Sequence, residues 1–154
     1  MEVFKGTFEG TGRRIAVVVS SFNEVISKQL LDGCCETLAK CKVSDDNVRV
    51  YWTPGSFEIP VIAKKMADSG SVDAVICLGA VIRGDTPHFD YVCTAVTKGI
   101  AEASVSSGVP VIFGIVTADT QEQALDRAGV KSGNKGSQAA LAAVEMANLA
   151  AQIK

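Results

Sequence analysis

The sequence predicts an α/β fold, a three-layer sandwich in which helices flank a four-stranded parallel sheet. Apolar, β-branched runs alternate along the chain with segments whose apolar residues recur at helical spacing. This alternation is typical of parallel strand–helix–strand units with right-handed crossovers. The first run, Ile15–Ser20, is apolar at almost every position, as in a strand buried on both faces. The length of 154 residues is usual for one domain, so we expect residues 1–154 to form a single domain.

The expected strands are the β-branched runs of the chain. They span Ile15–Ser20, Val48–Thr53, Val72–Gly79 and Pro110–Thr117. Pro54-Gly55 ends the second strand, because this dipeptide favours a turn. An earlier segment, Val3–Phe8, also has strand character, and Gly10 and Gly12 follow it. We expect this segment to leave the main body and to join a neighbouring subunit.

Helical segments lie between and after these strands. The first and third are marked by apolar residues at Ile26, Leu30, Cys34, Leu38 and Cys41, and at Phe89, Val92, Cys93, Val96 and Ile100. The second helix begins over Ile59–Met66, with Pro60 confined to its first turn. The short fourth helix, Thr120–Ala128, has Thr120 and Gln123 at the positions of a capping box.

The last expected helix, Ser137–Ile153, is apolar around most of its circumference. Its polar residues form one narrow stripe of Gln138, Glu145 and Gln152, with Asn148 beside it. A helix of this kind needs more than its own sheet to cover it. A partner subunit and a deeper burial within the chain explain the pattern equally well.

Charge and hydropathy exclude several classes of function. The net charge of −2 and the pI of about 5.4 argue against a nucleic-acid binder, which usually carries a basic excess. The richest apolar run, Ala74–Ile82, has nine residues, about half of what a membrane span requires. Met1–Gly12 lacks the apolar core of a secretory signal. We therefore expect a cytoplasmic protein with no nucleic-acid or membrane partner.

Cysteine and histidine usage argues against a metal site. The five cysteines are Cys34, Cys35, Cys41, Cys77 and Cys93. Their number is odd, no CxxC motif occurs, and His88 is the only histidine. We expect buried, reduced thiols in helices and strands, as in a cytosolic protein, and no bound metal.

The candidate site lies where the strands end, because parallel sheets bind ligands beyond the carboxyl ends of their strands. The segments to search are Ser20–Asn23, Thr53–Glu58, Gly79–His88 and Phe113–Thr117. In the third segment, Thr86 is placed as the N-cap of a helix and Pro87 as its first residue. The free amides there form an anion site beside His88, a group suited to proton transfer. The alternative is that His88 is a surface residue on a capped helix.

Three further features suit a flat, hydroxylated and phosphorylated set of ligands. Ser56 and Glu58, in the motif PGSFEIP, offer hydrogen bonds to hydroxyl groups, although ordinary helix capping explains this segment equally well. Phe22 and Phe113, at expected strand ends, could stack on a heterocycle or belong to the core. Arg127, with Lys131 or Lys135 in a glycine-rich segment, could bind phosphate or be solvated. Together these residues favour a reaction that joins a heterocycle to a small phosphorylated compound.

The same motifs resemble those of the 6,7-dimethyl-8-ribityllumazine synthase family, which performs the penultimate step of riboflavin biosynthesis. The matching segments are Ser20–Asn23, Pro54–Pro60, Gly79–Asp90, Phe113–Thr117 and Ala128–Gly136. PGSFEIP and GAVIRGDTPHFD in this order are highly specific, and the resemblance spans nearly the whole chain. One departure is Ser21, where family members commonly carry arginine, so we expect one local salt bridge to be missing.

The resemblance implies a flavodoxin-like fold and a transferase without cofactor or metal. The family condenses 5-amino-6-(D-ribitylamino)uracil with 3,4-dihydroxy-2-butanone 4-phosphate and releases phosphate and water. By motif position, His88 would transfer protons. The ribitylaminouracil would contact Phe22, Ser56, Phe57, Glu58, Ala80, Val81, Ile82 and Phe113. The phosphate would contact Asp85, Thr86, Arg127 and Lys135.

The resemblance also implies assembly. Family members form homopentamers, and many build twelve pentamers into an icosahedral capsid of 60 subunits. In these assemblies the residues equivalent to Phe113 and Arg127 come from the neighbouring subunit. The short Gly129–Gly136 segment resembles that of capsid-forming members, so we expect the capsid here, with a riboflavin synthase as a further partner.

Three other functions are compatible with this fold class. An archaeal-type riboflavin synthase is the nearest, but the complete PGSFEIP and RGDTPHFD motifs favour the lumazine synthase. A flavin or lumazine carrier would need neither His88 nor Arg127. A flavodoxin-like redox protein would need a phosphate-binding loop after the first strand, and Ser20–Asn23 contains no glycine.

Overall fold

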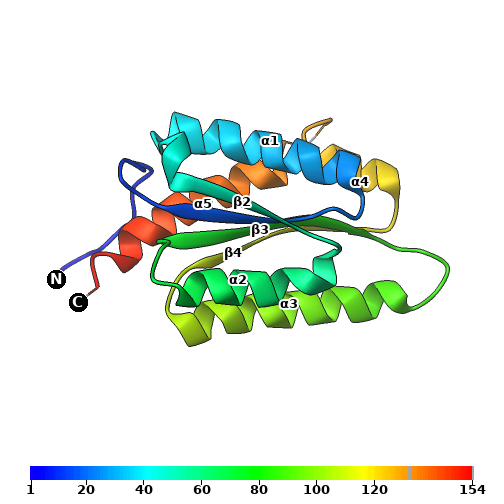
Figure 1. The fold of residues 1–154 in the computed structure, drawn as a ribbon. Coiled ribbons are helices and arrows are strands. Elements are labelled where there is room, and N and C mark those ends of the chain that lie inside the picture. The colour runs from blue at the N-terminus through cyan, green and yellow to red at the C-terminus, as the bar shows by residue number, and fades with distance from the viewer. Residues whose placement is uncertain (132, 154) are drawn as a thin grey trace.

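The computed structural model describes residues 1–131 and 133–153 and confirms the parallel sheet. Four strands are present in the described chain: β1 (Ile15–Ser20), β2 (Val48–Thr53), β3 (Ala74–Ile82) and β4 (Val111–Ala118). All neighbouring strands are parallel, in the order β2-β1-β3-β4. β1 and β3 therefore lie at the centre of the sheet (Figure 1).

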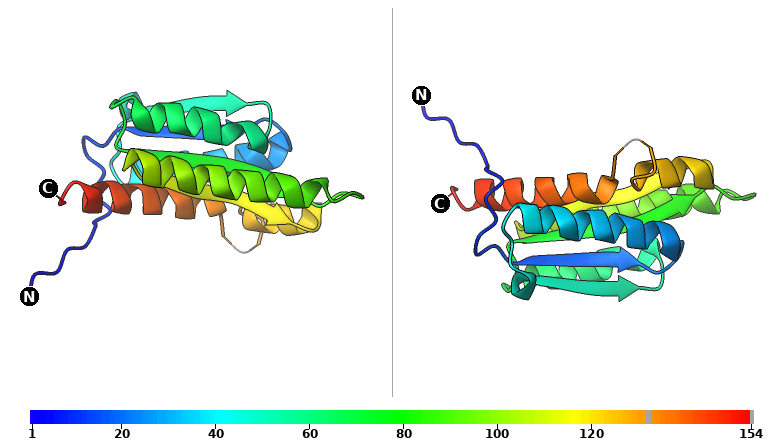
Figure 2. Two further views of the ribbon diagram at one scale, coloured as in Figure 1. Left: turned by 90° about the horizontal axis from the view of Figure 1, so that it is seen from below. Right: turned by 90° about the horizontal axis from the view of Figure 1, so that it is seen from above.

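Helices cover both faces of the sheet and complete the three layers. They are α1 (Glu24–Lys40), α2 (Ile59–Asp68), α3 (His88–Ser107), α4 (Gln121–Arg127) and α5 (Lys135–Ala150), with short 3-10 turns η1 (Asp45–Asn47) and η2 (Ser56–Glu58). Figure 1 shows α1, α4 and α5 on one side of the sheet and α2 and α3 on the other. Figure 2 shows the same layers from above and below. The expected flavodoxin-like sandwich is confirmed.

Two hydrophobic clusters, one on each face, form the core. In β1, Ile15, Val17 and Val19 pack with the apolar residues of α1 and α5, whereas Ala16 and Val18 pack with those of α2 and α3. Successive side chains of a strand point to opposite faces, so a central strand covered on both sides is apolar throughout. This explains the continuous apolar run of β1, which is fully buried.

Some boundaries differ from the sequence-based expectation because strand pairing and capping decide them. β3 begins two residues later than predicted and extends to Ile82, which pairs with Ala118 of β4. Ala80, Val81 and Ile82 therefore belong to a strand and not to a loop. β4 begins and ends one residue later than predicted. α5 begins at Lys135, where Asn134 accepts a hydrogen bond from the Ser137 amide at 3.1 Å, and it ends at Ala150.

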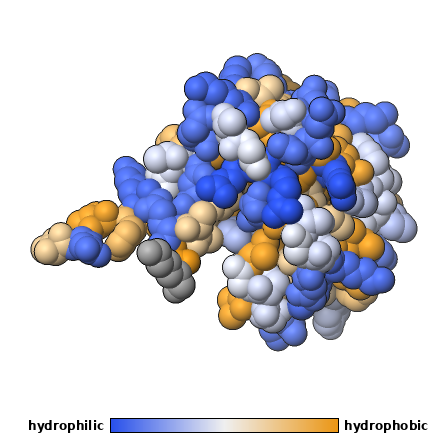
Figure 3. Space-filling view, turned by 60° about the vertical axis from the view of Figure 1, so that its left-hand side comes forward, coloured by the Kyte–Doolittle hydropathy of each residue, from blue (hydrophilic) through white to orange (hydrophobic). Residues whose placement is uncertain are grey.

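The N-terminal residues form no strand within the described chain. They run along α5, where the Asn148 amide donates to the carbonyl oxygens of Thr7 (2.8 Å) and Glu9 (2.9 Å). Gln152 donates to the Lys5 carbonyl at 3.0 Å. Part of the polar stripe on the last helix thus holds this segment. The outermost residues project as an arm (Figures 2 and 3), with Phe4 exposed.

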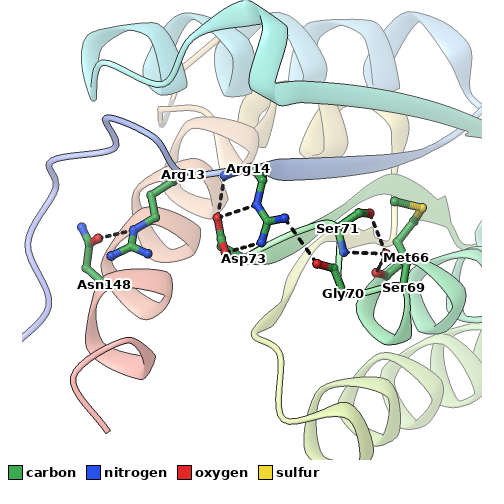
Figure 4. Close-up of polar contacts among 8 residues, drawn as sticks. All are labelled: Arg13, Arg14, Met66, Ser69, Gly70, Ser71, Asp73 and Asn148. Carbon is green, nitrogen blue, oxygen red and sulfur yellow. Dashed lines mark hydrogen bonds and ion pairs between the residues drawn. The ribbon is translucent and has the colours of Figure 1, made fainter. Parts of the chain in front are cut away.

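Two adjacent arginines anchor the start of β1 in different directions (Figure 4). Arg13 donates to Asn148 at 2.7 Å and so reaches α5. Arg14 meets Asp73, whose carboxylate accepts from the Arg14 amide at 2.8 Å and from its guanidinium at 3.0 Å. Burial raises the pKa of Asp73, but the hydrogen bonds from Arg14 outweigh burial and hold this pKa below its ordinary value. The pair fixes the turn before β3 against β1.

The cysteines are all free thiols, but they are not all buried. Cys34, Cys41 and Cys77 are buried, Cys93 is partly buried, and Cys35 lies exposed on α1. The expectation of five buried thiols is therefore wrong for Cys35, which is exposed. Burial raises the pKa of the Cys34 and Cys77 thiols, which keeps both neutral.

Candidate active site

A cavity of about 640 Å³ opens at the carboxyl ends of β1, β2 and β3. It is lined by Phe22, Asn23, Gly55, Ser56, Phe57, Glu58, Ala80, Val81, Ile82, Gly84, Thr86, His88, Phe89 and Val92. All but Phe89 and Val92 come from three of the four segments that the sequence singled out. β1 and β3 are neighbours here, and the helices that follow them, α1 and α3, cover opposite faces of the sheet. The cavity therefore occupies the topological switch point, where sheets of this kind bind ligands.

Two aromatic side chains stand free at the cavity. Phe22 is 70% exposed and Phe57 is 63% exposed. The Phe22 amide donates to the Ser20 hydroxyl at 3.2 Å, which holds the chain just after β1. Because exposing a phenyl ring to water is unfavourable, a bound flat ring would stabilise either residue by stacking.

The motif PGSFEIP forms η2 and the start of α2, and its Ser56 is part of the cavity lining. Ser56 is only 6% exposed, yet its Oγ has no hydrogen-bond partner among the described residues. Gly79 of β3 makes room for it, since a Cβ at that position would lie 2.8 Å from the Ser56 Oγ. A buried hydroxyl without a partner is costly, and a ligand hydroxyl would satisfy it.

The end of β3 presents its backbone to the cavity. The ladder between β1 and β3 ends with the pair Val19–Leu78. The ladder between β3 and β4 continues as far as Ile82. No β1 residue pairs with β3 beyond Leu78. On that side the Asn23 side chain donates to the Ala80 carbonyl oxygen at 2.9 Å, so the backbone beyond Ala80 is the part left for a ligand.

His88 lies at the rim of the cavity as the first residue of α3. The expected N-cap is wrong by one residue: Pro87 occupies that position, because the helical backbone begins only at His88. The Thr86 hydroxyl still accepts from the His88 amide, at 3.4 Å. His88 is exposed, as a group that exchanges protons with a substrate must be.

Arg83 ties the loop before His88 to the end of β4. Its guanidinium donates to Asp119 at 2.9 Å and approaches Asp90 at 3.5 Å. It also lies 4.4 Å from the centre of the Phe89 ring, within the range of a cation–π contact. The hydrogen bond to Asp119 raises the pKa of Arg83 further above its ordinary value. These contacts join the loop that carries Thr86 to the segment that leads into α4.

Three further candidate residues, Phe113, Arg127 and Lys135, line a second cavity, of about 360 Å³, beside β4. Its lining consists of Phe113, Ile115, Val116, Thr117, Arg127, Lys135 and Gln138. The structure brings Arg127 and Lys135 together, whereas Lys131 is not part of either lining. Phe113 lies within β4 and not at its end. The glycine after it allows close packing, because a Cβ on Gly114 would lie 3.2 Å from that of Ala139 in α5.

The two cavities have no lining residue in common. Within one chain, the ring-binding candidates and His88 are therefore separated from Phe113, Arg127 and Lys135. Asp85 lines neither cavity and is exposed on the loop before α3. Sequence reasoning left out Asn23, Phe89 and Val92, although Asn23 stands in one of the segments it selected and the other two follow His88 on α3.

Among residues 1–131 and 133–153, no group of three or more histidine, cysteine, aspartate or glutamate side chains is arranged to hold a metal ion. In the same part of the chain, no helix is both long and apolar enough to cross a membrane.

The fold and the cavities define a class of protein: an α/β protein with a cavity at the switch point of a parallel sheet and the histidine His88 in its lining. The sequence pattern of the 6,7-dimethyl-8-ribityllumazine synthase family matches residues 12–151. A relative from Desulfatibacillum aliphaticivorans, named 6,7-dimethyl-8-ribityllumazine synthase, is 54% identical over 152 residues. That match covers 99% of this chain and 98% of the relative. The chain belongs to the 6,7-dimethyl-8-ribityllumazine synthase family, and the resemblance of its motifs is confirmed.

Proposed function

We propose that this chain condenses 5-amino-6-(D-ribitylamino)uracil with 3,4-dihydroxy-2-butanone 4-phosphate to form 6,7-dimethyl-8-ribityllumazine, with the cavity at the ends of β1–β3 as the uracil site. One observation carries the proposal. Every residue that the motifs assign to ribitylaminouracil, except Phe113, lines the same cavity as His88. This cavity is of the size that small-molecule sites usually have.

The uracil ring would stack on Phe22, and its edge would meet the backbone of Ala80–Ile82. Ser56 and Glu58 would hold the ribityl chain, since the unpartnered Ser56 hydroxyl needs a polar partner. Phe57 would cover the ring and the chain from the solvent side. This arrangement fixes the reacting amine of the uracil toward the rim of the cavity, where His88 lies.

The reaction needs proton transfers and the expulsion of phosphate. The amine attacks the ketone carbon, a C–N bond forms and water leaves, which gives an imine. A proton then leaves the adjacent hydroxyl-bearing carbon, the electron pair of that C–H bond forms a C=C bond, and the C–O bond to phosphate breaks with its electron pair on the leaving group. The enol that results becomes a ketone. The ribitylamino nitrogen closes the second ring with loss of a further water. His88 would accept and return protons in these steps, and one such group contributes roughly 10²- to 10⁴-fold in rate.

Orientation supplies much of the remaining acceleration, because the reaction joins two bound molecules. Holding two reactants in the orientation of reaction can lower the activation free energy by about 7–11 kcal/mol in favourable cases. The rigid end of β3 and the anchored loop around Thr86 suit this role.

The phosphate site would be completed by a second copy of the chain. Arg127, Lys135 and Phe113 line a different cavity from His88, so one chain alone does not surround both substrates. We therefore propose that the cavity beside β4 of one subunit closes over the Thr86 loop of the next, with Asp85 at this junction. The assembly we propose is the homopentamer, with twelve pentamers in a capsid and a riboflavin synthase as a further partner.

The apolar surface of α5 supports this association. Leu141 is 39% and Met146 41% exposed on that helix in the single chain, and burying such side chains against another subunit is favourable. The projecting N-terminal arm, with Val3 and Phe4 exposed, would pair with the neighbour as the sequence pattern predicts. We place the enzyme in the cytoplasm, where its free thiols stay reduced.

The test is turnover by the assembled protein with both substrates, against the background rate without protein. The proposal expects a catalysed rise in lumazine fluorescence that disappears when either substrate is omitted. A flavin or lumazine carrier is the alternative. It would be purified as a yellow protein, would keep its ligand on dialysis, and would not raise the rate above background.

A further inference from the structure

Asn23 begins α1 in an unusual way. Its backbone is in the left-handed region, with φ 59° and ψ 50°, a conformation that asparagine tolerates better than most residues. An asparagine at this position normally accepts a hydrogen bond from an amide of the first turn, but the Asn23 side chain makes no such bond. Instead its Nδ2 donates to the Ala80 carbonyl oxygen at 2.9 Å. The side chain therefore reaches away from its own helix to β3.

This hydrogen bond crosses the crevice between the two central strands. The β1–β3 ladder ends at the pair Val19–Leu78, so no β1 residue lies opposite Ala80 to bond its carbonyl on that side. Asn23 supplies the missing donor from the loop that follows β1. Because a carbonyl oxygen can only accept, the amide nitrogen and not the amide oxygen must face it. The bond thus continues the pairing of β1 and β3 into the floor of the cavity.

We infer that Asn23 is a positioning residue that sets the width of the slot for the heterocycle. The residue before it is Phe22, one wall of the cavity, and the group it binds belongs to the Ala80–Ile82 backbone, the other wall. Fixing Ala80 relative to the loop holds the ring of Phe22 at a constant distance from the β3 edge. The inference rests on the proposed function, because it assigns Asn23 to the uracil side of that reaction.

Two substitutions separate this role from the alternatives. Asn23→Asp keeps the size and an acceptor oxygen, but at neutral pH it has no donor and places a carboxylate against the Ala80 oxygen. Asn23→Gly keeps the left-handed backbone without strain and removes the side chain. Asn47→Asp serves as the matched control, since it makes the same exchange on η1, before the amino end of β2.

The readouts are the KM for each substrate, the Kd for the lumazine product by fluorescence, and the thermal midpoint. We expect both Asn23 variants to raise the KM for ribitylaminouracil and the product Kd by about tenfold or more, as loss of a partly buried hydrogen bond implies. The KM for butanone phosphate should stay within about twofold of the wild type, and Asn47→Asp should match the wild type throughout.

Wild-type affinities in Asn23→Asp, with losses only in Asn23→Gly, would overturn the inference, because an acceptor to the ligand would then suffice. Equal losses for both substrates with a lower thermal midpoint would overturn it as well, since they indicate a general structural role. Absence of turnover in the wild type would instead contradict the proposed function itself. The wild-type assay thus separates the two failures.

Discussion

The side chains proposed for the chemistry are exposed in the single chain, while those that position them are buried or bonded. His88 and Phe22 are exposed at the cavity, whereas Ser56 and Ala80 are buried behind them. Exposed histidines at helix starts are common, so the exposure of His88 is not by itself evidence of a catalytic role. The neighbouring loop, tied to Asp119 through Arg83, gives His88 a fixed place.

Replacing His88 tests its role in proton transfer. We expect His88→Ala to lower kcat by roughly 10²- to 10⁴-fold without abolishing turnover, because binding and orientation of both substrates remain. Single-turnover formation of lumazine measures the effect, and sedimentation confirms that folding and assembly are intact. Wild-type kcat, or the loss of all product from an assembled variant, would contradict this role.

Replacing Arg127 tests the phosphate site. Arg127→Ala should raise the KM for butanone phosphate by about tenfold or more, since a charge-assisted hydrogen bond is lost. The KM of Arg127→Lys for butanone phosphate should lie between those of Arg127→Ala and the wild type. Lysine keeps the positive charge but cannot form the bidentate hydrogen bonds of the guanidinium group. Lys65→Ala, an exposed cation on α2, is the control for net charge. Unchanged kinetics in Arg127→Ala would remove this residue from the site.

At the scale of elements, the sequence predicted the order and type of the strands and helices because burial on two faces leaves a strong pattern. The predicted β1, which is buried at every position, agrees with the structure at both ends. The end of β3 could not be predicted, since it depends on pairing with β4 as far as Ile82. The same holds for Asn23, whose partner Ala80 is 57 residues away, and no local pattern reveals such a contact.

The ion pair of Arg14 and Asp73, which joins β1 to the turn before β3, should make the stability of the fold depend on pH. Asp73 has a lowered pKa in the folded chain, from an ordinary value of 3.8. Its contribution to stability is therefore complete above about pH 4 to 5 and is lost as the pH falls through the lower folded-state pKa. Asp73→Asn should lower stability at pH 7 by about 1 kcal/mol or less, because the pair is partly exposed and screened by solvent.

The measurement for Asp73 is the unfolding midpoint across pH at one protein concentration. The difference between wild type and Asp73→Asn should shrink as the pH falls below 3.8, the ordinary pKa of this carboxyl. Asp46→Asn, an exposed residue of η1, should show no such trend. A difference that stays constant with pH would show that the ionised Asp73 does not stabilise the fold.

At the scale of the whole molecule, the division of the candidate residues between two cavities is the central structural result. The motifs selected both groups of residues, and only the resemblance to the family, not composition or spacing, indicated that Phe113 and Arg127 lie apart from His88 in one chain. Phe113 and Arg127 are brought beside β4 by the sheet order, with β4 at the opposite edge from β2. This division is the reason for proposing that a second copy of the chain completes the site.

Mixed assemblies test this requirement. Co-assembly of His88→Ala and Arg127→Ala chains in equal amounts should restore about a quarter of the wild-type activity if each site joins two subunits, because random mixing leaves that share of sites with both residues intact. Activity equal to the mean of the two separate variants would show that one chain supplies both residues. Sedimentation of the wild type should show pentamers or capsids of pentamers, and a monomer that turns over at the full rate would contradict the assembly.

The most direct test of the account is to follow lumazine formation and phosphate release together in the wild-type protein. The account predicts a catalysed rise in lumazine signal with inorganic phosphate released one to one, since each ring closure requires the loss of one phosphate. A folded, assembled protein that gives no lumazine above the background rate, or that releases phosphate without forming lumazine, would contradict it.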